Sequence, residues 1–181
     1  MRLRNLLRKE GIEPDLISLD QCFMIDPNII RLIIKISNLN KSDIVCEIGA
    51  GTGILTKKLC KYSKKVYAIE KDNRLYNILS VMLKKENNLE IVMGDAKKYG
   101  FFNANKIVSN LPYGILDWFF KELNDYDFEL AVLTIPLKFY ENQLSKYKNL
   151  IVEKIKVVFP ASFYPQPKGK SVVLKIKRKK S

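Results

Sequence analysis

The fold is decided by the stretch Asp43-Ile-Val-Cys-Glu-Ile-Gly49-Ala-Gly-Thr-Gly53. Its first half is a short apolar run typical of a buried strand, and its second half is a glycine turn that opens a helix reaching to Tyr62. Glycine permits positive φ and removes the side chain that would keep a ligand away from the backbone. A strand, a glycine turn and a helix in this order predict one unit of a parallel sheet with a ligand site at the turn.

Strand-like and helix-like segments alternate on both sides of this stretch. Before it, Asp26 and Pro27 are suited to an N-cap and a first helical position, which predicts a helix over 26–37. After it, the hydrophobic pattern predicts strands over 65–69, 89–93, 106–109 and 128–135, helices over 72–85 and 116–123, and a closing pair of strands over 150–159 and 171–177. The alternation indicates an α/β fold whose mainly parallel sheet carries helices on both faces.

The composition indicates a single domain over 1–181 with a polyanionic partner. Hydrophobic residues make up 47% of the 181 residues, enough to bury a core, and the formal net charge of +13 favours nucleic acid. A general lysine-rich bias would give the same charge without a directed role. We assign 1–18 as a basic N-terminal extension and 178–181 as a basic tail. We expect the basic N-terminus and the run from Lys175 to Lys180 to dock RNA electrostatically.

Other classes of protein are disfavoured by what the sequence lacks. No apolar run reaches the roughly 18 residues of a membrane helix. The basic N-terminus is not followed by the apolar segment and small-residue cleavage site of a signal peptide. Histidine is absent, and the three cysteines, Cys22, Cys46 and Cys60, lack zinc-type spacing. We therefore predict a reduced, cytoplasmic protein that uses neither a metal nor a Ser-His or Cys-His nucleophile. We also expect a monomer with no membrane partner.

The glycine stretch is more specific than a bare turn. Its third glycine comes too early for the G-x-G-x-x-G of nicotinamide-binding folds. Glu47 before the first glycine gives E-x-G-x-G-x-G, which is typical of S-adenosylmethionine-dependent methyltransferases. A tight strand-to-helix turn without any ligand is the alternative.

Two acidic residues follow later strands at positions suited to a nucleoside. Glu70 ends the second predicted strand about 20 residues after Gly49, where it can accept both ribose hydroxyls. Asp95 follows the third strand, where its carboxylate can accept from an adenine amine while the Ala96 N–H donates to the ring. The alternatives are a solvated surface carboxylate for Glu70 and a helix N-cap for Asp95.

The most informative motif is Ser109-Asn110-Leu111-Pro112-Tyr113, at the end of the fourth predicted strand. An amine on a heteroaromatic ring is a poor nucleophile because its lone pair is delocalised. Hydrogen bonds from the amine to the Asn110 side-chain oxygen and the Leu111 carbonyl would localise that pair and stabilise the charge that develops on nitrogen. Pro112 would aim the carbonyl, and Tyr113 would stack an extruded base. A proline turn with a packed tyrosine is the alternative.

These four motifs, in this order and spacing, resemble the ribosomal RNA adenine dimethyltransferase family. That family includes the small-subunit dimethyltransferases and the erythromycin-resistance methyltransferases. Two further stretches are similar to its motifs. Asp20-Gln-Cys-Phe-Met-Ile-Asp26 is similar to G-Q-[HN]-F-L-x-D, and Phe159-Pro-Ala-Ser-Phe-Tyr-Pro-Gln-Pro-Lys-Gly-Lys-Ser171 to V-P-x-x-F-x-P-x-P-K-V-x-S. The resemblance covers residues 19–176, nearly the whole chain.

The resemblance implies a Rossmann-like class I methyltransferase with a mostly parallel seven-stranded sheet. It would methylate the exocyclic amine of a flipped base, adenine N6 of ribosomal RNA, and leave S-adenosylhomocysteine as product. The implied cofactor contacts are Gln21, Phe23, Glu47, Gly49, Gly51, Glu70, Lys71, Asp95, Ala96 and Asn110. The implied catalytic set is Asn110, Leu111, Pro112, Tyr113 and Phe163, with the rings of Tyr113 and Phe163 on either side of the base.

The chain departs from the family pattern at several places. Cys22 stands where the family has His or Asn, which predicts a weaker cofactor contact, and Asp20 and Gly169 replace Gly and Val. The stretch 134–142, TIPLKFYEN, replaces a Q-K-E-V-A-x-R-L helix, and we expect only the catalytic domain without the family's helical RNA-binding domain.

Three other functions stay open. Cytosine N4 presents the same chemistry as adenine N6. Glutamine methylation of a protein uses a similar Asn-Pro-Pro-Tyr loop, although Leu111 in place of the first proline and the basic charge argue against it. A non-catalytic RNA-binding assembly factor on this scaffold would show degraded cofactor motifs, whereas those of this chain are intact apart from Cys22.

Overall fold

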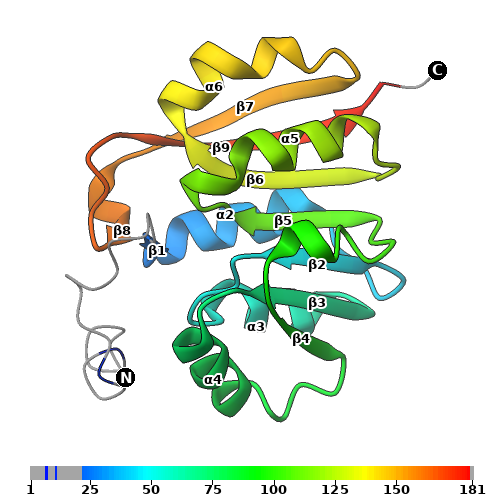
Figure 1. Cartoon of the computed structure of the whole chain (residues 1–181), viewed down its shortest axis with the longest axis vertical. Helices are drawn as coiled ribbons and strands as arrows, with labels where there is room; N and C mark the ends of the chain where they lie inside the picture. The colour runs from blue at the N-terminus through cyan, green and yellow to red at the C-terminus, as the bar shows by residue number, and fades with distance from the viewer. Residues whose placement is uncertain (1–6, 8–10, 12–21, 180–181) are drawn as a thin grey trace.

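The computed structural model describes Leu7, Gly11 and residues 22–179 (Figure 1). Its strands are β1 (Phe23–Met24), β2 (Ile44–Ile48), β3 (Lys65–Glu70), β4 (Leu89–Met93), β5 (Lys106–Asn110), β6 (Leu130–Pro136), β7 (Leu150–Val158), β8 (Phe163–Tyr164) and β9 (Ser171–Arg178). Its α-helices are α2 (Pro27–Ser37), α3 (Ile54–Tyr62), α4 (Asn73–Met82), α5 (Leu116–Asp125) and α6 (Leu137–Gln143). Every helix and strand predicted between 26 and 177 is present, with bounds that differ by a few residues.

The large sheet has the strand order β4-β3-β2-β5-β6-β9-β7. Strands β2 to β6 pair in parallel, whereas β9 is antiparallel to both β6 and β7. Parallel neighbours need a crossover connection, and α3, α4 and α5 supply three of them. The parallel strands therefore end at the same edge of the sheet. The predicted α/β fold with a mostly parallel seven-stranded sheet is confirmed.

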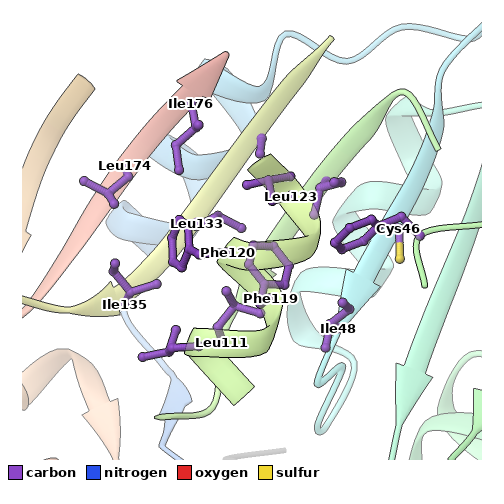
Figure 2. Close-up of a cluster of buried hydrophobic side chains, with 14 of the residues drawn as sticks. Cys46, Ile48, Leu111, Phe119, Phe120, Leu123, Leu133, Ile135, Leu174 and Ile176 are labelled. Atoms are coloured by element: carbon purple, nitrogen blue, oxygen red, sulfur yellow. The ribbon is translucent and has the colours of Figure 1, made fainter. Parts of the chain in front are cut away.

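Helices cover both faces of this sheet. On one face, α5 packs Phe119 and Phe120 against β6 and β9, which contribute Leu133 and Leu174 (Figure 2). On the other face, α2 and α3 pack against a second cluster that includes Val132. Neighbouring residues of one strand supply the two clusters because successive side chains point to opposite faces.

The helix after β1 begins as its sequence predicts. The Asp26 carboxylate accepts from the Asn28 N–H at 2.8 Å, and Pro27 occupies the first helical position. Asn38 ends the helix in the left-handed conformation, with φ of 46°. The apolar face then buries Ile29, Ile30 and Ile33 against the sheet.

One pair of strands and one α-helix were not predicted. The short strands β1 and β8, 140 residues apart along the chain, form a separate antiparallel pair in which Phe23 lies opposite Tyr164 and Met24 opposite Phe163 (Figure 1). This pair brings together the two stretches that extended the family resemblance. The unpredicted helix is α6. It shows that the stretch 134–142, which replaces the family's helix, still contains a helix.

Two kinds of feature are absent from residues 22–179. No helix there has the length and apolar composition needed to cross a bilayer. The same residues contain no group of three or more histidine, cysteine, aspartate or glutamate side chains arranged to hold a metal ion.

Candidate active site

A pocket of about 440 Å³ opens at the sheet edge where the parallel strands end. Cofactor and ligand sites commonly have volumes of about 300–1,000 Å³, and in open α/β sheets they occur at this edge. The predicted site residues that line the pocket are Phe23, Gly49, Gly51, Glu70, Lys71, Asp95, Ala96, Asn110, Leu111, Pro112, Tyr113 and Phe163. Gln21 lies outside the described residues.

The glycine turn folds closely against its neighbours. Gly49 and Gly51 have φ of 73° and 59°, a region that glycine adopts readily. The Gly49 N–H donates to the Ile69 carbonyl at 2.9 Å, which fixes the turn over the end of β3. A Cβ at Gly49 would lie 3.2 Å from Pro112, and one at Gly51 would lie 3.0 Å from the Phe23 ring. The turn therefore requires glycine for both its conformation and its space.

Glu70 is buried at the end of β3 and holds the glycine turn in place. Its Oε2 accepts from the Gly51 N–H at 2.7 Å, and its Oε1 accepts from the Asp72 N–H at 2.9 Å. Burial raises the pKa of Glu70, and these backbone hydrogen bonds oppose the rise. A side chain only 3% exposed is not a solvated surface carboxylate, so that alternative is wrong. Each oxygen can accept a second hydrogen bond, which leaves acceptor capacity for ribose hydroxyls.

Asp95 serves as the N-cap of the short 3-10 helix Ala96–Lys98. Its Oδ1 accepts from the Lys97 N–H at 3.0 Å, and its Oδ2 accepts from Lys71 Nζ at 3.2 Å. The Lys97 hydrogen bond and the Lys71 ammonium lower the pKa of Asp95. The helix-cap interpretation is therefore correct for its geometry. Because the carboxylate also lines the pocket, the adenine contact stays a prediction.

Glu47 is separated from the main pocket. It is 2% exposed and lines a neighbouring cavity of about 40 Å³ that shares Gly49 and Gly51 with that pocket. Its Oε2 has no hydrogen-bond partner among the described residues. Burial raises the pKa of Glu47 to about 8, and the negative charge of Glu70 adds to the rise. Glu47 is therefore mostly protonated at neutral pH, and its direct cofactor contact stays a prediction.

The backbone of Cys22, the residue before β1, orients the Asn110 side chain. Its Nδ2 donates to the Cys22 carbonyl at 2.8 Å, across a separation of 88 residues. This bond uses the amide nitrogen, so Oδ1 is the acceptor of a side chain that lines the pocket. Because the Cys22 backbone makes the contact, the thiol in place of His or Asn does not alter it.

The rest of the Asn110 motif continues along the pocket wall. Leu111 is buried, and its N–H donates to the Thr134 carbonyl at 3.1 Å, which ties the loop to β6. Tyr113 is half-buried against the cluster that contains Phe119 and Phe120 of α5. Phe163 is 3% exposed within the cluster on the other face of the sheet, which contains residues of α2 and α3. The two residues thus line one pocket while they pack in clusters on the two faces of the sheet, and their contact with a base stays a prediction.

Sequence reasoning missed two hydroxyl residues of the pocket. Thr134 of β6 and Ser171 of β9 both line it and are both buried. The available signal for Thr134 was a single polar residue in the otherwise apolar run LAVLTIP over 130–136. That signal does not reveal which strand lies alongside, so it could not place the hydroxyl beside Asn110.

The basic run at the C-terminal end is not next to the pocket. Strand β9 starts at Ser171, which lines the pocket, and runs antiparallel to β6, so Arg178 lies towards the opposite edge of the sheet. The exposed lysines nearest Ser171 along the chain are Lys168 and Lys170. The N-terminal extension, apart from Leu7 and Gly11, lies outside the described residues.

The sequence of this chain is similar to those of known ribosomal RNA methyltransferases. A family model described as ribosomal RNA adenine dimethylase matches residues 16–181. A probable ribosomal RNA small subunit methyltransferase A from Methanococcus aeolicus is 40% identical over 176 residues, covering 89% of this chain and 65% of that protein. The protein of the same name from Pyrococcus abyssi is 38% identical over 192 residues, covering 99% of this chain and 71% of that protein.

Solved structures show the same relationship. A dimethyladenosine transferase from Plasmodium falciparum superposes with a TM-score of 0.81 at 33% identity, covering 87% of this chain and 63% of that chain. The 23S rRNA methyltransferase ErmE shares the fold with a TM-score of 0.75 at 24% identity, covering 87% of this chain and 70% of that chain. This chain spans 65% of the length of the Methanococcus aeolicus relative. With a family model matched over nearly all of its residues, the chain belongs to the ribosomal RNA adenine dimethylase family.

Proposed function

We propose that this chain transfers a methyl group from S-adenosylmethionine to the exocyclic amine of an adenine in ribosomal RNA. The observation that carries the proposal is the Asn110 amide, whose nitrogen is held by the Cys22 carbonyl at 2.8 Å. With the nitrogen engaged, Oδ1 is available to accept from a substrate amine next to the Leu111 carbonyl. The names of the relatives, which include a dimethyladenosine transferase, favour adenine over cytosine.

The residues of the other half of the pocket fit the cofactor. Gly49 and Gly51 line the pocket with backbone alone, Glu70 keeps acceptor capacity, and Asp95 lies at the pocket wall. When bound, S-adenosylmethionine supplies a methyl group that its sulfonium already activates. The glycine turn, Glu70 and Asp95 would hold the methionine, ribose and adenine ends in that order along the sheet edge.

The chain's own contribution to the chemistry is to prepare the amine. Asn110 Oδ1 and the Leu111 carbonyl would both accept hydrogen bonds from the amine. These two bonds favour an amine whose lone pair is localised on nitrogen and not delocalised into the ring. The same acceptors stabilise the positive charge on that nitrogen as the new bond forms. A strong general base is not required, in keeping with an Asn110 motif that contains no ionisable side chain except Tyr113.

The direct test is to identify the modified nucleoside. The protein is incubated with unmodified small-subunit ribosomal RNA and S-adenosylmethionine carrying an isotopically labelled methyl group, and the RNA is digested for mass spectrometry. We expect label in N6-methylated adenosine. Label in N4-methylcytidine would change the substrate base, and RNA without label would contradict the proposed function.

Replacing Glu70 by alanine is expected to weaken cofactor binding by about 10- to 100-fold, because a hydrogen bond to a charged group contributes about 1.5–3 kcal/mol. The removal of the Gly51 hydrogen bond would add to the effect by loosening the turn. Calorimetric titration with S-adenosylmethionine measures it. Glu90→Ala is the matched control, because Glu90 forms an exposed ion pair with Lys65 outside the pocket. Equal affinities for the two variants would refute the Glu70 assignment.

RNA docking is expected to depend on Lys168 and Lys170, the exposed lysines that precede the pocket residue Ser171 in the chain. Replacing Lys168 and Lys170 by glutamine should reduce the slope of log K against log salt concentration by about 0.7–0.9 for each phosphate that a lysine no longer neutralises. Lys177 and Lys179 are the control pair, because both are exposed near the far end of β9. Fluorescence anisotropy with labelled ribosomal RNA over a salt series gives both slopes. A larger change for the control pair would mean that RNA docks through the basic tail.

A further inference from the structure

Thr134 is a buried residue whose hydroxyl has no protein partner among the described residues. It is 1% exposed in β6, and its Oγ1 hydrogen-bonds to none of them. A buried hydroxyl without a partner destabilises the folded state, and valine would fill almost the same volume without that cost. Thr134 is one of the residues that line the 440 Å³ pocket, and its Oγ1 is buried there, so a ligand that packs against this wall can supply the missing partner.

The hydroxyl lies beside the proposed amine acceptors. In the parallel ladder of β5 and β6, Thr134 is the register partner of Asn110. Register partners in neighbouring strands point to the same face of a sheet, so the two side chains lie next to each other. The Thr134 carbonyl also accepts from the Leu111 N–H at 3.1 Å, which fixes the Asn110–Leu111 segment to the same strand.

The strand order places Thr134 away from the proposed cofactor contacts. Glu70 ends β3 and Asp95 follows β4, and both strands lie on one side of β2. Asn110 and Thr134 belong to β5 and β6, which lie on the other side of β2. Thr134 is therefore in the half of the pocket where the substrate base would lie.

We propose that the Thr134 hydroxyl donates a hydrogen bond to the ring nitrogen adjacent to the exocyclic amine of the substrate base. This inference rests on the proposed function, because it requires an aminated base in the pocket. In adenine that ring nitrogen, N1, is an acceptor, so the edge of the base presents an amine donor beside an acceptor. Two acceptors from the Asn110 loop and one donor from Thr134 complement this edge. Guanine carries a carbonyl and an N–H there, which leaves the two acceptors without donors.

The first experiment compares Thr134→Val with Thr134→Ser. We expect Thr134→Val to lower kcat/KM for unmodified small-subunit ribosomal RNA by about 5- to 100-fold, mainly through KM, because a buried ring nitrogen loses its donor. Thr134→Ser should keep most of the activity. The calorimetric Kd for S-adenosylmethionine should stay unchanged, and the denaturant midpoint of Thr134→Val should equal or exceed that of the wild type.

Thr56→Val is the matched control, because Thr56 is also a buried threonine but lies on α3, outside the pocket lining. It should keep the wild-type KM for RNA. A wild-type KM for Thr134→Val would overturn the inference, and so would a denaturant midpoint well below the wild type, since Thr134 would then serve the fold.

The second experiment tests the ring nitrogen itself. RNA is prepared with 1-deazaadenosine in place of the adenosine that the wild type methylates. The wild type should lose about as much efficiency on this RNA as Thr134→Val loses on normal RNA, and Thr134→Val should lose little more. Equal discrimination by both proteins would overturn the inference alone. Absence of methyl transfer by the wild type to any RNA would overturn the proposed function as well.

Discussion

Replacing Asn110 by alanine is expected to slow methyl transfer by about 10²–10³-fold while the affinity for S-adenosylmethionine changes little. Removal of one preorganised polar group that faces developing charge commonly has an effect of this size. The residues proposed to hold the nucleoside, Glu70 and Asp95, follow other strands, so their contacts should persist. Single-turnover transfer to ribosomal RNA, measured beside calorimetric cofactor binding, separates the two effects. Near-normal transfer by Asn110→Ala would mean that the motif is structural.

Asn110→Asp sharpens this prediction through its pH dependence. A protonated carboxyl can donate to the Cys22 carbonyl as the Asn110 amide does, and its other oxygen can still accept from the substrate amine. An ionised carboxylate has no donor, so the Cys22 carbonyl would face a negative oxygen. Activity relative to wild type should therefore fall as pH rises through the pKa of the introduced carboxyl, approaching tenfold per pH unit. A ratio that is constant with pH would contradict the orienting role of the Cys22 carbonyl.

The free energy of unfolding is expected to fall by about 3–4 kcal/mol between pH 5 and pH 8 because of Glu47 alone. Burial raises the pKa of Glu47 to about 8, whereas its ordinary value is 4.5. The folded state therefore binds the proton more tightly than the unfolded state. The resulting stability is complete below the unfolded pKa and is lost as pH rises through the folded pKa.

Glu47→Gln provides the test, because glutamine has almost the same shape and does not ionise. Denaturant unfolding at pH 5, 6, 7 and 8 should show a much flatter dependence for the variant. Hydrogen bonds lower the pKa of Asp26, Asp72 and Asp95, so these groups change stability mainly below pH 4, outside the window. Burial also raises the pKa of Glu70, which is present in both proteins, so the difference between the two profiles reports Glu47. Parallel pH profiles for wild type and variant would show that Glu47 does not titrate in this range.

Much of the fold could be predicted from local signals. Asp26 and Pro27 marked the start of α2, and the alternation of apolar runs located the parallel strands within a few residues. Such signals depend on neighbours in the chain, namely capping groups and the period of the side chains. The pair of β1 and β8 escaped prediction because two residues on each side carry no periodicity, and only a partner 140 residues away makes them strands.

The same division holds for the pocket. Most of its lining residues could be predicted because they are contiguous in the chain, as in the glycine turn and in Asn110 to Tyr113. The different surroundings of the two carboxylates could not be predicted, because Glu47 and Glu70 both lie at or next to the end of an apolar strand. The fold separates Glu47, enclosed without a described partner for Oε2, from Glu70, which holds the turn and lines the pocket.

The sequence by itself thus determined the class of fold, the family and the motifs that meet at one sheet edge. Only the tertiary structure decided that the Cys22 carbonyl orients Asn110, that Thr134 lies beside it, and that the basic end of β9 leads away from the pocket. The physical reason is that hydrogen bonding and burial depend on distances between strands. Those distances follow from strand order and register, which residues far apart in the chain determine together.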